Sequence, residues 1–176
     1  MALQTLIRAV YPPQCMMCET RIEDDHGLCP ACRRETEFLT GAACDCCALP
    51  QPGLAEGQIL CDRCIKDHPP WNQGRAALVY GGAGRRLVMA LKHGDRLDIV
   101  PGAASWMARA GQDLITPNSL LIPIPLHWTR RLMRRYNQSA LLAQSIARTT
   151  GAVYLPEALR RPKRTPKLDG MGRQSR

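Results

Sequence analysis

The chain has 176 residues, carries a net charge of +9 and is 45% apolar. This length suits one full domain, or one small domain with part of another, and the composition excludes a wholly disordered chain. Aromatic residues make up only 5% of the sequence, so large stacking surfaces for nucleic-acid bases are scarce.

Cysteine and charge divide the chain at about residue 70. All nine cysteines lie between Cys15 and Cys64. Residues 1–70 carry a net charge of −4 (6 Lys and Arg against 10 Asp and Glu), and residues 71–176 carry +13 (18 against 5). We therefore predict two domains, 1–70 and 71–176, and look for an anionic ligand on the second.

The sequence also predicts where the protein works. It contains neither a signal peptide nor a run of 18 apolar residues, so we expect a cytoplasmic protein without membrane insertion. In a reducing cytoplasm, clustered thiols hold a metal more often than they form disulfides.

Eight of the cysteines form four C-x-x-C pairs in two tandem sets. In such a pair a tight turn brings both sulfurs to one point, and two pairs complete a tetrahedron around Zn²⁺. Closed four-thiolate sites leave no open position for water, so we predict two structural zinc ions without catalysis at either. The predicted ligands are Cys15, Cys18, Cys29 and Cys32 for one ion, and Cys44, Cys47, Cys61 and Cys64 for the other.

Other interpretations of these cysteines stay open. A rubredoxin-like iron site fits the same spacing, whereas redox chemistry usually employs a single C-x-x-C motif at a helix start. Cys46 is a ninth thiol that could replace Cys44 or Cys47, although the C-x-x-C spacing favours pairing Cys44 with Cys47. We expect His26, between the first two pairs, to be a solvated loop residue.

The second part of the chain predicts an α/β fold. Leu120–Pro125 is an apolar run without polar alternation, which is typical of a buried parallel strand. Residues 128–150 predict one long helix whose inward face includes Leu132, Tyr136 and several alanines. The remaining expected elements are a strand over Ala77–Tyr80, helices over Arg85–His93 and Ile99–Asp113, and a strand over Val153–Leu155.

Four arginines follow the predicted 120–125 strand at the start of the next helix. A strand, a loop and a helix N-terminus form the usual phosphate site of α/β folds. The alternatives are a solvated arginine cluster, a helix-end role for Lys92 and a turn role for His127. The candidate anion-binding residues are Lys92, Pro125, Leu126, His127, Arg130, Arg131, Arg134 and Arg135, and the catalytic residues are unknown.

The tandem cysteine sets, Tyr80, Leu91-Lys92 and the segment LIPIPLHWTRRLMRRYNQSALLAQSIA together resemble the ComF/GntX family. That resemblance implies a double zinc ribbon followed by a type I phosphoribosyltransferase-like domain, in a protein of DNA uptake during natural transformation. It implies phosphoribosyl pyrophosphate, single-stranded DNA or competence proteins as partners. In this family the loop after the 120–125 strand would meet pyrophosphate.

Several positions depart from or match the family pattern. Arg135 stands where the family often has Gly, and Tyr136 where it often has Phe. Segment 160–176 would be a mobile basic loop in which Leu168 replaces a usual Gln. Thr165, Gly170, Arg173 and Arg176 match the family's mobile loop.

The family pattern continues with an apolar strand that ends in two acidic residues and a Thr/Gly-rich turn for ribose 5-phosphate. This element is absent from the 176 residues, so we expect a C-terminally truncated domain without transferase activity. Mg²⁺ would be needed only with a complete donor site. Two alternatives are a single-stranded-DNA handling factor without transfer chemistry and an interaction module whose acidic ribbons dock a partner.

Overall fold

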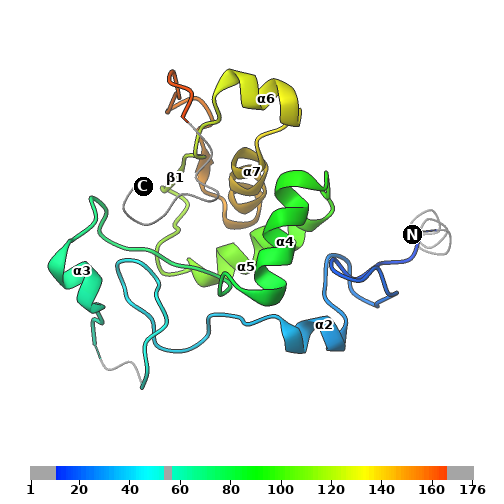
Figure 1. The fold of residues 1–176 in the computed structure, drawn as a ribbon, viewed down its shortest axis with the longest axis horizontal. Helices are drawn as coiled ribbons and strands as arrows, with labels where there is room; N and C mark the ends of the chain where they lie inside the picture. The colour runs from blue at the N-terminus through cyan, green and yellow to red at the C-terminus, as the bar shows by residue number, and fades with distance from the viewer. Residues whose placement is uncertain (1–10, 54–56, 166–176) are drawn as a thin grey trace.

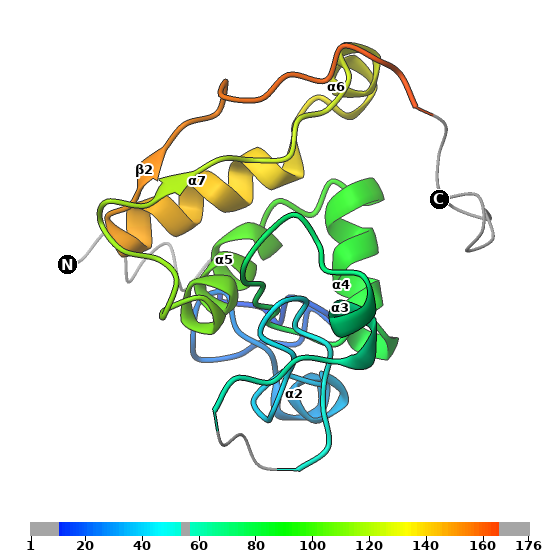
Figure 2. The ribbon, with the colours of Figure 1, turned by 90° about the vertical axis from the view of Figure 1, so that its left-hand side faces the viewer.

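The computed structural model describes residues 11–53 and 57–165. The cysteine-rich segment lies at one end, α4 and α5 lie in the middle, and α6 lies at the opposite end (Figures 1 and 2). The predicted mixed α/β character is confirmed. In chain order the elements are α2 (Pro30–Glu35), α3 (Asp62–Lys66), α4 (Gly82–His93), α5 (Ile99–Ala110), β1 (Leu120–Leu121), α6 (Trp128–Arg134), α7 (Gln138–Thr150) and β2 (Val153–Tyr154).

The sheet consists of β1 and β2, which pair in parallel with Leu120 opposite Val153. The predicted parallel strand thus forms, but it is only two residues long and is not buried as predicted, since Leu120 is 58% exposed. The chain continues as a loop from residue 122, where Pro123 and Pro125 have no N–H to donate to a ladder. Helix α7 connects the two strands and covers one face of the sheet (Figure 2).

Small side chains allow α7 to approach α5 closely. Ala104 and Ala108 of α5 pack with Ile146 of α7 in a buried cluster, which Leu121 of β1 also contacts. The inward alanine face that the sequence predicts for the segment now seen as α7 is therefore confirmed at Ala147, which is buried. This contact fixes the sheet and α7 on the α4–α5 pair.

The single helix predicted over 128–150 is wrong, because the chain forms α6 and α7 with a break between them. Arg135 has a left-handed backbone (φ 63°) and ends α6. Asn137 begins α7, since its Oδ1 accepts the N–H of Ser139 at 3.0 Å, and its Nδ2 donates to the carbonyl of Ile124 at 3.1 Å. The break turns Leu132, which was predicted to point inward, to 72% exposure.

Other predicted boundaries also differ: α4 begins at Gly82 rather than Arg85, and β2 ends at Tyr154 rather than Leu155. Segment 77–80 does not join the parallel sheet; instead Leu78 bridges Phe38 in antiparallel fashion, and Val79 N–H donates to Glu37 O at 3.0 Å. Helix α5 ends at Ala110 rather than Asp113, because Gly111 serves as its C-cap. The 77–80 segment therefore ties the basic part of the chain to the connector between the cysteine sets.

A hydrophobic cluster spans the predicted domain boundary. Met16, from the turn of the first cysteine set, packs with Leu87 of α4 and Ile99 of α5. Arg96 adds a polar link, since its guanidinium donates to Glu19 Oε1 at 3.0 Å and to the Met16 carbonyl at 3.3 Å. The division at residue 70 stays a prediction, and the two parts share this buried contact.

The packing predicts that Gly102→Ala destabilises the protein. A Cβ on Gly102 of α5 would collide with the carbonyl oxygen of His26 and with the sulfur of Met16. We expect the zinc-loaded protein to lose about 1–3 kcal/mol of unfolding free energy in urea titrations. Gly41→Ala, where nothing lies within 4 Å, is the matched control and should stay within about 0.5 kcal/mol of wild type. Equal losses in both variants would contradict this docking of α5.

Candidate metal centres and basic end

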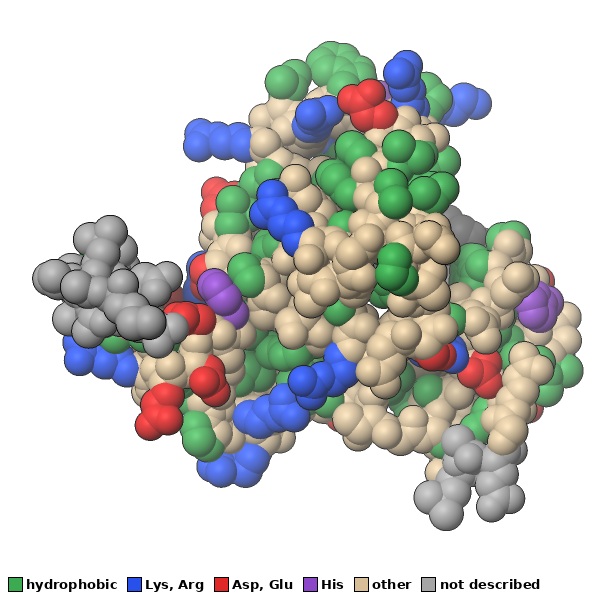
Figure 3. All heavy atoms as spheres, turned by 180° about the vertical axis from the view of Figure 1, so that it is seen from behind, with side chains coloured by type: hydrophobic (Ala, Val, Ile, Leu, Met, Phe, Trp, Pro, Cys, Tyr) green, Lys and Arg blue, Asp and Glu red, His purple; other side chains and the backbone are tan. Residues whose placement is uncertain are grey.

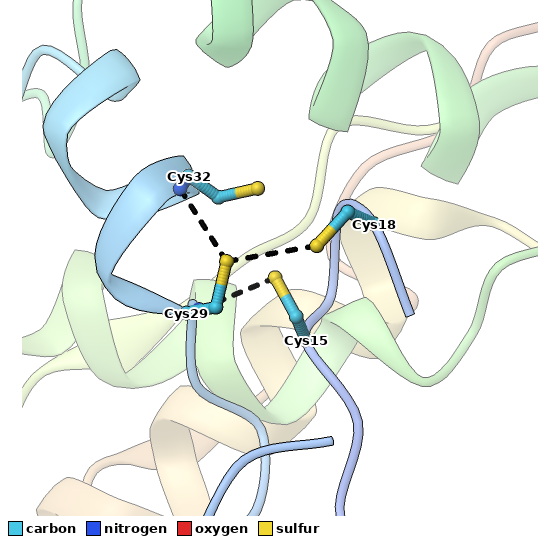
Figure 4. Close-up of side chains that lie close together, drawn as sticks. All are labelled: Cys15, Cys18, Cys29 and Cys32. Carbon is cyan, nitrogen blue, oxygen red and sulfur yellow. Dashed lines mark hydrogen bonds between the residues drawn. The ribbon is translucent and has the colours of Figure 1, made fainter. Parts of the chain in front are cut away.

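The first four predicted cysteine ligands converge on one point. Cys15 and Cys18 come from a tight turn, and Cys29 and Cys32 come from the start of α2, so that their sulfurs face one another (Figure 4). All four Sγ atoms lie within 4.8 Å of one another. The Sγ atoms of Cys18 and Cys29 are 3.6 Å apart.

The second set repeats this arrangement with Cys44 and Cys47 in a turn and Cys61 and Cys64 at the start of α3. The Sγ atoms of Cys47 and Cys61 are 3.7 Å apart. Four sulfurs at about 2.3 Å from a zinc ion form a tetrahedron with edges of about 3.8 Å. Both clusters therefore have the size of a four-thiolate zinc site.

The backbone hydrogen bonds show that the two clusters are one motif used twice. Cys15 N–H donates to Thr20 O at 2.8 Å, and Cys44 N–H donates to Leu49 O at 2.8 Å. Each turn also contains a non-glycine residue with a left-handed backbone, Glu19 (φ 62°) in the first and Ala48 (φ 59°) in the second. The shared geometry extends beyond the cysteine spacing that the sequence displays.

Backbone N–H groups prepare the sulfurs for a cation. Cys29 N–H donates to Cys15 Sγ at 3.3 Å, and Cys61 N–H donates to Cys44 Sγ at 3.4 Å. Burial acts to raise the pKa of Cys44, but the N–H groups of Cys61, Cys47 and Cys46 outweigh it and lower this pKa to about 6. Hydrogen bonds to thiolate sulfur favour the charged form that binds a metal.

Within each set the thiols cannot all ionise on their own. Hydrogen bonding with the Thr20 hydroxyl and N–H, and with neighbouring thiols, lowers the pKa of Cys18 to about 6. Burial, followed by neighbouring thiols, raises the pKa of Cys32. A divalent ion among the four sulfurs stabilises every thiolate at once. The two clusters fit two zinc ions, which would be structural because no coordination position is left for water.

Cys46 lies outside the second cluster. Its side chain is fully buried, and its Sγ lies 3.7 Å from the carbonyl oxygen of Trp71 and 4.0 Å from Nε2 of His68. The indole N–H of Trp71 donates in return to the Cys46 carbonyl at 2.8 Å. These contacts hold the connector after α3 against the turn between Cys44 and Cys47. His26 lies exposed in a loop with φ 61°.

The residues predicted to bind an anion lie around the loop after β1. His127 is buried and begins α6, where its Nδ1 accepts the N–H of Thr129 at 3.4 Å. Arg131 and Arg135 are exposed on the surface. Tyr136 donates to the carbonyl of Leu91 at 2.9 Å and thereby brings the end of α4, where Lys92 lies, to the α6–α7 corner.

A second basic segment joins the arginines of α6. The guanidinium of Arg130 donates to the carbonyl of Thr165 at 2.8 Å, and Arg161 hydrogen-bonds to the hydroxyl of the same residue. The predicted family-loop positions Leu168, Gly170, Arg173 and Arg176 lie outside the described residues. We call the resulting surface the basic end; its members are Arg130, Arg131, Arg134, Arg135, Arg160, Arg161, Lys163 and Arg164.

Sequence reasoning missed one feature of the basic end. Trp128, Arg131, Leu132 and Arg135 line an open hollow of about 480 Å³ on α6. The spacing of Trp128 and Arg131 could have indicated that the two side chains share one helix face. The prediction of a single helix over 128–150 did not show which face of this segment is exposed to solvent. In Figure 3 hydrophobic side chains gather at this tip of the molecule, with Lys and Arg side chains projecting beside them.

Comparison with known proteins places the chain in a family. Residues 6–65 match the family model of the double zinc ribbon domain. The DNA utilization protein YhgH of Salmonella typhimurium is 30% identical over 162 residues, which cover 88% of this chain and 69% of the relative. The protein belongs to the YhgH family. The YhgH proteins of Shigella flexneri and Escherichia coli K12 are 30% and 29% identical over the same coverage.

Membership of the YhgH family confirms part of the sequence prediction. The double zinc ribbon agrees with the two four-cysteine clusters and with zinc in both. No solved structure matches the chain. None of the helices in the described part of the chain is long and apolar enough to cross a membrane.

The two clusters predict a defined zinc content for cysteine variants. We expect two zinc ions per chain in the wild type and one in Cys18→Ser or Cys47→Ser, because each variant removes one ligand from one cluster. Cys46→Ser is the control and should keep both ions. The measurement is atomic emission on protein purified under reducing conditions. If Cys46→Ser loses an ion while Cys47→Ser keeps two, Cys46 is the ligand.

Proposed function

We propose that this protein is a ComF-like DNA-uptake protein that holds single-stranded DNA on its basic end. The observation that carries the proposal is the hydrogen bond from Arg130 to Thr165 O, at 2.8 Å. It joins two basic segments that lie far apart in the sequence into one surface. When Lys and Arg side chains of such a surface neutralise DNA phosphates, the counterions condensed on the DNA are released, and this release favours binding.

The distribution of acidic residues supports this location. Glu157 is the only acidic residue between positions 114 and 165, so little on that stretch competes with phosphate for the arginines. Residues 1–70 carry −4 before any thiolate is counted, and four thiolates around each Zn²⁺ add further negative charge. A polyanion is therefore attracted to the basic end and repelled by the ribbons.

The relatives supply a second line of support. The proteins that match this chain over 88% of its length are named DNA utilization proteins. Their name specifies neither a DNA-binding residue nor a chemical step. The basic end accounts for a DNA-related role through non-catalytic binding of the polymer.

We further propose that the region after residue 70 is phosphoribosyltransferase-like and binds anions without transferring a phosphoribosyl group. The parallel pairing of β1 and β2, with a loop leading from β1 into α6, supports the likeness. Transfer needs carboxylates to hold Mg²⁺ or the ribose hydroxyls near the anion loop. Between residues 114 and 165 the sequence offers Glu157 alone, and Asp95, beside Tyr136 at the α6–α7 corner, adds one separate carboxylate.

Phosphoribosyl pyrophosphate is a second candidate ligand, because the family resemblance implies that the loop after the 120–125 strand meets pyrophosphate, and Arg131 follows that loop in the sequence. Calorimetric titration separates the two ligands. Binding of phosphoribosyl pyrophosphate that Arg131→Ala abolishes, without any binding of DNA, would favour the small ligand over the polymer.

The proposal predicts the salt dependence of DNA binding. Each phosphate contact to single-stranded DNA contributes about 0.7 to the slope of log K against log salt. The double variant Arg131→Ala/Arg135→Ala should therefore lower the slope by about 1.4, measured by fluorescence anisotropy with a labelled oligonucleotide at several salt concentrations.

The matched control removes two exposed arginines away from the basic end, Arg109→Ala on α5 and Arg148→Ala at the end of α7. It changes the net charge of the protein by the same amount and should leave the slope close to that of wild type. A flat salt response of the wild type, or an equal loss of slope in both double variants, would exclude DNA binding at the basic end.

A further inference from the structure

We infer that the hollow on α6 is a stacking site for one base of the bound strand, with Trp128 as the platform and Arg131 and Arg135 as clamps for the flanking phosphates. This inference rests on the proposed function and names the contact that phosphate binding alone does not supply. A stacking site needs a base for binding, whereas a purely electrostatic surface needs only the phosphates.

Three of the four lining residues lie on one face of α6, and the fourth, Arg135, is its C-cap. Arg131 and Leu132 follow Trp128 by three and four residues, and Arg135 completes the lining from the C-cap position. Residues at these spacings are neighbours on a helix surface. The hollow therefore has an apolar strip beside a cationic strip, which matches the division of a nucleotide into base and phosphate.

The exposure of Trp128 needs explanation. Its side chain is 65% exposed, although a buried tryptophan would contribute much more to folding. The neighbouring Leu132 is 72% exposed on the same face. Apolar side chains gathered on an open surface usually mark a binding site.

Charge selects nucleic acid among the possible occupants. Helix α6 has no acidic residue, and its arginines adjoin those of segment 160–165 through the Arg130–Thr165 hydrogen bond. Base stacking on an aromatic ring beside a cationic groove is the usual design of sites that hold single strands without sequence preference. The hollow has a volume of about 480 Å³, which is large enough to accept one base.

Trp128→Ala tests the platform, with Trp128→Phe as the conservative variant. Loss of one stacked base should weaken binding of a poly-dT oligonucleotide about 5- to 100-fold, whereas phenylalanine should restore most of it. The salt slope should not change in Trp128→Ala, because no phosphate contact is lost. Tyr80→Ala removes another exposed aromatic ring, located before α4, and should leave the affinity unchanged.

An abasic strand of the same length provides the complementary test. It keeps the phosphates but has no bases, so wild type should bind it about as weakly as Trp128→Ala binds poly-dT. The affinity of Trp128→Ala for the abasic strand should be only slightly lower than its affinity for poly-dT. Tryptophan fluorescence should fall on binding poly-dT in wild type and much less in Trp128→Phe.

The outcomes separate the stacking site from the proposed function. If poly-dT binds with the expected salt slope but Trp128→Ala and the abasic strand match wild type, the stacking site is overturned while DNA binding stands. No binding of any strand overturns both. If anionic lipid vesicles shift the fluorescence of Trp128 and oligonucleotides do not, the hollow serves a membrane surface and the inference is overturned.

Discussion

Thiolate coordination is the constraint on which the rest of the fold depends. The turn between Cys15 and Cys18 contains Met16, and this side chain enters the cluster formed with Leu87 and Ile99. The first metal site therefore fixes one wall of the core on which α4 and α5 rest. A structural zinc site contributes on the order of 10–16 kcal/mol in small peptides, which is comparable to the whole net stability of a domain, about 5–15 kcal/mol. The order of dependence runs from the ribbon to α5, then to α7 and the short sheet.

The second ribbon uses the same motif, and the charged side chain of Arg75 links it to the end of α5. Asp45, next to Cys44, accepts the Ile59 N–H at 2.9 Å and lies 3.2 Å from the guanidinium of Arg75. The same guanidinium contacts Asp113 after α5 at 2.5 Å and, chiefly through this hydrogen bond, holds the pKa of that carboxyl below its usual value. This link contributes stability above the ordinary pKa of Asp113 and loses it as the pH falls through the lowered value. Partial exposure of both side chains keeps the contribution modest.

The sequence could predict the metal ligands because their chemistry is local: a C-x-x-C pair brings its sulfurs together whatever surrounds it. It predicted a parallel strand over 120–125 and a strand over 153–155, but neither the pairing of these two strands with each other nor their length of two residues. The break at Arg135 could not be read from residue type, since neither glycine nor proline marks it. Asn137 was the available signal, because asparagine is a preferred N-cap, yet the continuous apolar spacing suggested an unbroken helix. The error mattered for the site, because it assigned Leu132 to the core and left the exposed side of α6 undefined.

The arrangement of helices keeps the two charged ends from cancelling each other. The first ribbon packs on α5, α5 packs on α7, and α6 lies beyond α7, so that the ribbons and the basic end face opposite ways (Figures 1 and 2). Packed helices lie about 8–10 Å apart, and the Debye length at physiological salt is about 8 Å. The two helix layers separate the ribbons from the arginines of α6 by more than this length, so salt in the surrounding solution weakens the interaction between their exposed charges. On the proposal made above, a strand held at Arg131 and Arg135 would meet the local positive charge of the basic end.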